Sequence, residues 1–150
     1  MNIYKFHNKP EELNNYEEIY KLPEVAYKKA GAIDAGRVPE LEPYIIKDPF
    51  YACNYARFFI NGRWPEAEPV IMRNPDAAVA YAEQVLKGRW PPAEDIIMKD
   101  AETATDYAIY VMKARWLEAE DVILNSKFED AYLSFIDEWH HRNSDELDWD

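Results

Sequence analysis

The sequence predicts an all-α fold, a right-handed α-solenoid of about five two-helix repeats with degenerate capping repeats. The first observation is the Gly-Arg-Trp-Pro motif of residues 62–65, which returns at residues 88–91 with a period of 26. The second is an apolar pattern of helical spacing within each such unit. A fixed period of this length is typical of repeat proteins, in which each unit buries the apolar face of its neighbour.

Equal steps from this motif divide the chain into repeats within one predicted domain, residues 1–150. The predicted repeats are 10–35, 36–61, 62–87, 88–113 and 114–139, followed by an acidic tail at 140–150. The first and last repeats depart from the pattern, as capping units usually do.

Each clear repeat predicts a short helix followed by a longer one, and residues 62–87 illustrate this. Pro65 suits the first turn of the short helix, because a proline lacks the N–H that has no helical partner there. Asn74 and Pro75 suit the N-cap and first residue of the longer helix. The matching caps in the other repeats are Asp48, Asp100 and Ser126.

The longer helix carries apolar residues at i, i+3, i+4, i+7 and i+8, the pattern of one buried face. In the 62–87 repeat these residues are Ala78, Tyr81, Ala82, Val85 and Leu86. Gly62 and Gly88 follow the ends of such helices, where a left-handed residue is favoured. We therefore expect these two glycines to adopt the left-handed conformation.

The composition indicates an acidic protein of the cell interior. The net charge is −12, and residues 114–150 contribute −8 of it. We expect neither direct nucleic-acid binding nor membrane attachment, because both need clustered Lys and Arg. Cys53 is the only cysteine, and no signal peptide or membrane-spanning run is evident. These features predict a cytoplasmic location, in the host cell if the protein is viral.

The series Lys47-Asp48-Pro49-x-x-Ala52-x-x-Tyr55-Ala56, followed by the Lys-Gly-Arg-Trp-Pro of residues 87–91, resembles a tandem helical repeat of tailed bacteriophages and large viruses. The alternation of short and long helices is also similar to leucine-rich-variant α-solenoids, whose repeats are slightly shorter. The resemblance covers residues 36–124 well. It implies a solenoid with an interaction role, and it implies no catalytic residues.

Tryptophans and arginines recur in register, and each column allows two interpretations. The tryptophans are Trp64, Trp90 and Trp116, the arginines are Arg37, Arg63, Arg89 and Arg115, and the glutamates that follow the arginines are Glu42, Glu68, Glu94 and Glu120. The tryptophans could stack bases or sugars, but a buried stack between repeats is the simpler interpretation. The arginines could bind phosphates, but internal Arg–Glu pairs that staple neighbouring repeats are simpler.

The remaining candidates for chemistry are weak. Carboxylate pairs such as Glu66 and Glu68 could hold cations or act in hydrolysis, but they recur at helix starts, where the helix dipole explains them. His140 and His141 are adjacent and point apart on a helix, unlike typical zinc ligands. Cys53 has no histidine in register. We therefore predict a non-enzyme with no cofactor and no metal site.

The residues that do not repeat are the most informative about function. They lie on the longer helices opposite the buried face, where stability does not fix them, yet several are apolar. Aromatic residues with an arginine and polar neighbours are typical of a protein-binding patch, although burial in an inner curve or against a second copy would also explain them. The predicted partner-binding residues are Phe50, Asn54, Arg57, Phe58, Asn61, Glu83, Asp106, Ile109 and Tyr110.

These patterns predict a protein–protein interaction module that binds another protein, most simply one with a basic surface. If the origin is a phage, the partner would be a host factor that the protein modulates. The alternative is an acidic nucleic-acid mimic that inhibits a DNA- or RNA-binding protein. Mimicry requires acidic groups spaced along one face and binding that collapses with salt.

Overall fold

The computed structural model describes residues 18–33 and 36–144, and within these ranges the chain is all-helical, without a β-strand. The elements are α2 (Pro23–Ile33), α3 (Glu42–Ile45), α4 (Pro49–Tyr55), η1 (Ala56–Ile60), α5 (Glu68–Ile71), α6 (Pro75–Tyr81), η2 (Ala82–Leu86), α7 (Pro91–Ile97), α8 (Ala101–Asp106), η3 (Tyr107–Met112), η4 (Leu117–Ala119), α9 (Glu120–Leu124) and α10 (Glu129–Ser144). Much of the predicted first repeat, 10–35, lies outside the described residues. The predicted acidic tail, 140–150, overlaps the end of α10, which includes residues 140–144.

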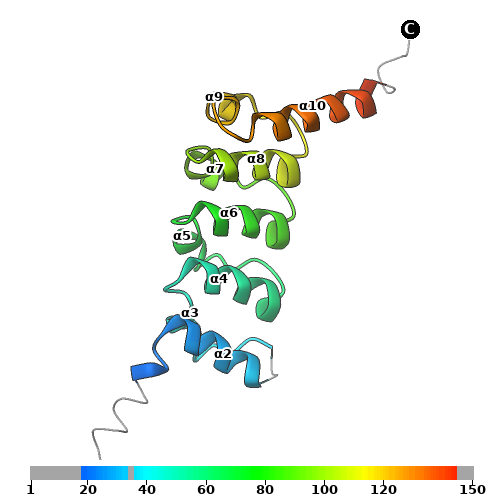
Figure 1. The fold of residues 1–150 in the computed structure, drawn as a ribbon. Coiled ribbons are helices and arrows are strands. Elements are labelled where there is room, and N and C mark those ends of the chain that lie inside the picture. The colour runs from blue at the N-terminus through cyan, green and yellow to red at the C-terminus, as the bar shows by residue number, and fades with distance from the viewer. Residues whose placement is uncertain (1–17, 34–35, 145–150) are drawn as a thin grey trace, which may run out of the picture.

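The helices are arranged in chain order, as Figure 1 shows. The longer helices α2, α4, α6, α8 and α10 lie one above the next, and the short helices lie along one edge of this stack. Contacts join α2 to α4, α4 to α6, and α6 to α8. The chain therefore packs mainly against its own sequence neighbours, so each inner helix pair is covered by the pair before it and the pair after it.

The predicted N-caps Asp48, Asn74 and Asp100 are confirmed. Asp48 accepts hydrogen bonds from the backbone N–H of Phe50 and Tyr51, at 2.9 and 3.0 Å. Asn74 and Asp100 each accept one from the residue three positions later, at 2.9 and 3.0 Å. The prediction for Ser126 is wrong, because α10 begins at Glu129. The Ser126 hydroxyl accepts a hydrogen bond from the N–H of Phe128 at 3.1 Å, in the turn before the helix. The bonds to Asp48, Asn74 and Asp100 satisfy N–H groups that have no partner inside the helix, which fixes where α4, α6 and α8 begin.

The predicted left-handed conformation of Gly62 and Gly88 is wrong by one residue. The left-handed positions are Asn61, Lys87 and Lys113, with φ of 54°, 56° and 53°. The last turn of each of these longer helices is widened to a π-helix, and the N–H of Gly62 reaches back to the carbonyl of Ala56 at 3.1 Å. In this wider hydrogen-bonded turn, the left-handed residue that ends the helix is the one before the glycine, Asn61.

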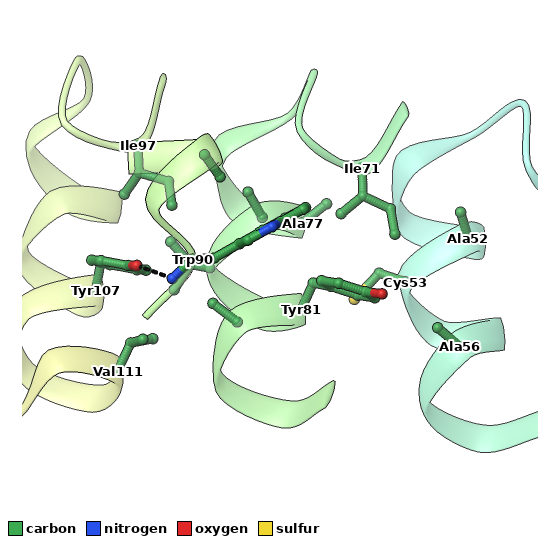
Figure 2. Close-up of a cluster of buried hydrophobic side chains, with 14 of the residues drawn as sticks. Ala52, Cys53, Ala56, Ile71, Ala77, Tyr81, Trp90, Ile97, Tyr107 and Val111 are labelled. Carbon is green, nitrogen blue, oxygen red and sulfur yellow. Dashed lines mark hydrogen bonds between the residues drawn. The ribbon is translucent and has the colours of Figure 1, made fainter. Parts of the chain in front are cut away.

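Alanine lets successive longer helices approach closely. Two columns are fully buried: Ala26, Ala52, Ala78 and Ala104, and Ala30, Ala56, Ala82 and Ala108. The main contacts of α2 are with α3 and α4, both of which follow it, so the alanine face is the one that meets the following repeat. Figure 2 shows Ala52 on α4 and Ala56 at the start of η1, together with the buried residues of the next repeat.

The last helix ends this packing scheme. The step from Tyr107 to Tyr132 on α10 is 25, one short of the period of 26. The same step places Glu129 and Leu133 at the positions of the two alanine columns, and both are exposed, Leu133 by 43%. A charged residue and a large one therefore stand at the positions where alanine allows close approach in the preceding repeats.

Replacing Lys87 with glycine should stabilise the protein. A left-handed residue with a side chain costs roughly 1–2 kcal/mol, and the greater freedom of glycine in the unfolded chain offsets part of the gain. We expect Lys87→Gly to raise the free energy of unfolding in urea by about 0.5–1 kcal/mol. Lys99→Gly is the matched control, because Lys99 is also an exposed lysine but lacks the positive φ. We expect Lys99→Gly to lower the free energy of unfolding. An equal decrease of that free energy in both variants would contradict the prediction.

Candidate partner-binding surface

A buried tyrosine hydroxyl organises each repeat, and the 88–113 repeat shows the geometry. The hydroxyl of Tyr107 accepts a hydrogen bond from the backbone N–H of Trp90 at 2.6 Å. It donates one to Glu94 Oε1 at 2.9 Å. Arg89 holds the same carboxylate through two bonds, of 2.9 and 2.8 Å. We call this set of an arginine, a glutamate and a tyrosine the clasp, because it joins the loop before the short helix, the short helix and the longer helix.

Within residues 18–33 and 36–144, the same arrangement occurs four times. The other sets are Arg37, Glu42 and Tyr55; Arg63, Glu68 and Tyr81; and Arg115, Glu120 and Tyr132. The predicted internal Arg–Glu pairing is confirmed. The prediction that these pairs staple neighbouring repeats is wrong, because arginine, glutamate and tyrosine all belong to one repeat. Each arginine of the column is therefore paired with a glutamate of its own repeat, although about half of its side chain is exposed.

Pairing and burial shift the pKa values of several clasp side chains. The hydrogen bond from Arg89 holds the pKa of Glu94 below its usual range, and Arg115 does the same for Glu120. Burial raises the pKa of Tyr81 and Tyr107 to about 12. Each tyrosine therefore keeps the proton that it donates to the glutamate, as a structural contact requires.

The tryptophans join one repeat to the next. Trp64, Trp90 and Trp116 are at most 3% exposed, which agrees with the buried interpretation. Each ring packs against the clasp tyrosine of the preceding repeat, and the ring centroids of Trp90 and Tyr81 lie 5.0 Å apart. Figure 2 shows Trp90 between Tyr81 and Tyr107. The tryptophans are thus not accessible for stacking on bases or sugars.

The other candidate groups have environments of the kind that structural residues have. Cys53 is 2% exposed, and burial raises the pKa of its thiol to about 11, so the thiolate is scarce at neutral pH. His141 Nδ1 lies 2.8 Å from the carbonyl oxygen of Asp137, and His140 meets the edge of Trp139. Among residues 18–33 and 36–144, no group of three or more His, Cys, Asp or Glu side chains is placed to hold a metal ion.

The nine predicted partner-binding residues are exposed or half-buried. Phe50, Phe58 and Tyr110 are 47%, 60% and 53% exposed, which is high for aromatic side chains. The others divide into two sets: Arg57, Asn61 and Glu83 are exposed, and Asn54, Asp106 and Ile109 are half-buried.

Most of these residues gather around three surface hollows. Arg57, Phe58 and Asn61 line the first, of about 470 Å³. Glu83, Ile109 and Tyr110 line the second, of about 570 Å³. Glu83, Asp106 and Tyr110 share a third, of about 300 Å³. Phe50 and Asn54 line none of these three.

Asp106 lies among like charges. Burial raises the pKa of its carboxyl, and the negative charges of Glu102, Asp76 and Glu83 raise it further. These groups come from two successive longer helices, and all but Glu102 line the third hollow. A cationic group at this position would relieve the repulsion among the four carboxylates.

The hollows include residues that the sequence analysis did not select, notably Asp76, Gln84, Lys87 and Lys113. Asp76 and Gln84 lie in the same repeat columns as Phe50 and Phe58, and the lysines lie in the column of Asn61. Their position in the same repeat columns as the predicted residues is the sequence signal that could have identified them.

No family model, curated protein or solved structure matches this chain. None of the helices within residues 18–33 and 36–144 combines the length and apolar character needed to cross a membrane.

Removing a clasp hydroxyl should cost stability. In Tyr81→Phe, the N–H of Trp64 and the carboxylate of Glu68 each lose a partner in a buried setting. We expect the free energy of unfolding to fall by about 1–3 kcal/mol in a urea titration. Tyr110→Phe is the matched control, because this tyrosine is exposed, and we expect a change within about 0.5 kcal/mol. Equal effects would show that the clasp adds nothing to stability.

Neutralising Asp106 should stabilise the protein near pH 7. The pKa of Asp106 is raised in the folded state, so its ionised form opposes folding once the pH exceeds the ordinary value of 3.8. We expect Asp106→Asn to raise the free energy of unfolding by a few tenths of a kcal/mol, a size set by partial exposure. The gain should vanish below the ordinary pKa.

Thermal melts across pH check this, with Asp137→Asn as the control. Asp137 lies on the exposed face of α10, and its replacement changes the net charge by the same amount. Equal gains from the two variants would show that net charge, and not the setting of Asp106, is responsible.

Proposed function

We propose that this protein is a non-enzymatic interaction module, a right-handed α-solenoid that binds another protein on the outer face of its longer helices. The proposed partner presents a basic surface. If the protein is of phage origin, as its resemblance to phage repeats implies, that partner is a host factor. The observation that carries the proposal is the pair of exposed aromatic residues, Phe58 and Tyr110, of which Tyr110 shares a hollow with the carboxylates around Asp106.

The two aromatics occupy one column. Phe58, Gln84 and Tyr110 are separated by equal steps of 26, so they lie on successive longer helices in the same register. Packed helices are about 8–10 Å apart, which places the two aromatics on the order of 20 Å from each other. Arg57 bonds to Gln84 and covers part of Phe58, with its guanidinium carbon 4.6 Å from the ring centroid. The surface between the aromatics is thus already ordered.

An ordered surface supports affinity. The clasps and the alanine packing hold the longer helices in place before any partner arrives, so little conformational entropy is lost on binding. Exposed aromatics within a polar rim are the residue types that dominate binding energies at protein interfaces. Phe58 and Tyr110 therefore serve as the anchors of the proposed interface.

The acidic cluster determines the charge of the partner. Glu83 and Asp106 share their hollow with Tyr110 and with Asp76. A Lys or Arg of the partner would remove like-charge repulsion and add ion pairs in one step, which favours both association rate and orientation. The glutamates of the clasps contribute little to this attraction, because each is already paired with an arginine.

Nucleic-acid mimicry is the second candidate. It is supported by the net charge of −12. The compact grouping of Asp76, Glu83, Glu102 and Asp106 favours a local contact over a long row of phosphate-like charges. Salt separates the two functions: anchoring by aromatics persists in high salt, whereas mimicry is lost as the charges are screened.

The double variant Phe58→Ala/Tyr110→Ala should lose the partner while keeping its fold. Loss of two anchor residues typically costs about 2 kcal/mol or more, so we expect at least a roughly 30-fold weaker Kd. The partner is first captured from native host lysate with the wild-type protein and identified by mass spectrometry. Titration calorimetry then measures its affinity for each variant.

The matched control is Leu117→Ala/Val122→Ala, which removes exposed apolar area elsewhere on the molecule. These two side chains are 65% and 37% exposed. We expect this control to bind as the wild type does. Equal binding by the aromatic double variant and the wild type, with both folded, would eliminate the proposed interface.

A further inference from the structure

A series of hollows, each of which shares a lining residue with the next, lies along the C-terminal ends of the longer helices. The hollow of Arg57 and Phe58 shares Lys87 with the hollow of Tyr110. The latter shares Lys113 with a further hollow of about 530 Å³ on α10. The α10 residues of this last hollow are Phe135, Glu138, Trp139, Arg142 and Asn143.

The two lysines that join these hollows are unusual in two respects. Within the described residues, neither Lys87 nor Lys113 makes an ion pair or a side-chain hydrogen bond, although acidic residues outnumber basic ones by 29 to 17. Both also have positive φ, where a lysine is strained and a glycine is not. Backbone strain that persists beside a hollow is a reason to look for a function of the side chain.

The series carries positive charge and apolar surface together. Three cations line the two hollows nearest α10, against two carboxylates; they are Lys87, Lys113 and Arg142, with Glu83 and Glu138. Arg142 lies 4.0 Å from Glu138, an exposed pair that holds it weakly. Tyr110 and Trp139 supply the aromatic surface. An acidic peptide segment with apolar side chains complements this lining.

We propose that residues 145–150 of this chain, Asp-Glu-Leu-Asp-Trp-Asp, dock in these two hollows. The segment carries four carboxylates for the lysines and Arg142, and Leu147 and Trp149 for the apolar surface. It lies outside the described residues, and it follows directly from α10, whose residue Asn143 already lines the hollow.

The segment is long enough to reach both hollows. Trp149 is five residues beyond Ser144, and an extended chain of that length spans at most roughly 17 Å. Successive packed helices are about 8–10 Å apart. Leu147 therefore reaches the hollow of Lys113 and Trp149 the next one, beside Lys87. Because the segment is tethered, its effective concentration is high and weak contacts suffice.

Docking would cover Tyr110, which lines the hollow beside Lys87. The segment then competes with a partner for one of the two aromatic anchors, a consequence that rests on the proposed function. The docking itself does not rest on it, because it is a property of the isolated chain. The two proposals can therefore fail separately.

Amide NMR of the full chain tests the docking. The first variant replaces the four acids of the segment and leaves the helical repeats untouched: Asp145→Asn, Glu146→Gln, Asp148→Asn and Asp150→Asn. We expect the amide signals of Lys87, Gly88 and Lys113 to shift in this variant and in Trp149→Ala. Conversely, Lys87→Gln/Lys113→Gln should move the signals of residues 145–150 toward random-coil values.

The control is Lys47→Gln/Lys99→Gln, at the opposite ends of the longer helices, which should leave the segment's signals unchanged. Raising the salt concentration from about 0.05 M to about 0.5 M shortens the screening length about threefold and should weaken the docking. Random-coil signals for residues 145–150 in the wild type would overturn the proposal. Shifts that grow with protein concentration would overturn it too, because they indicate the segment of a second copy.

Discussion

The tyrosine hydroxyl of the clasp is the interaction on which the other features depend. It accepts from a backbone N–H at the start of a repeat and donates to the glutamate near the short helix, so it fixes the distance between the two helices. In the three preceding repeats the tyrosine lies 17 residues after its N–H donor, and in the last repeat 16. The bond to Tyr132 is still formed there, at 2.9 Å. The hydrogen bonds of the clasp are therefore formed even in the repeat that departs from the 26-residue period.

That one-residue change explains why the alanine columns do not continue on α10. Because Tyr132 keeps its place in the clasp, the rest of α10 is shifted by one residue relative to the preceding helices. Glu129 and Leu133 consequently occupy the close-approach positions that alanine fills elsewhere. The helix then extends to Ser144, and its Trp139 lines a hollow instead of joining a core.

Much of this arrangement could be predicted from the sequence, because it follows from local rules. The period, the caps at Asp48 and Asn74, and the Arg–Glu spacing each depend on residues close together in the chain. The role of the tyrosine hydroxyl could not be predicted in this way, since the partners of Tyr81 lie 13 and 17 residues away. The grouping of Asp106 with Asp76 also needed the structure, because it joins two repeats.

Stability of the fold explains only part of the distribution of charged residues on the longer helices. The helix dipole favours Asp76 and Glu102 in the first turns and lysines at the ends. It does not favour Asp106, which lies among like charges in the middle of the longer helix formed by α8 and η3, nor does it account for a lysine at positive φ. Both features oppose folding where the surface is hollowed and aromatic. Residues that lower the stability of the fold in this way are the first places to look for a binding site.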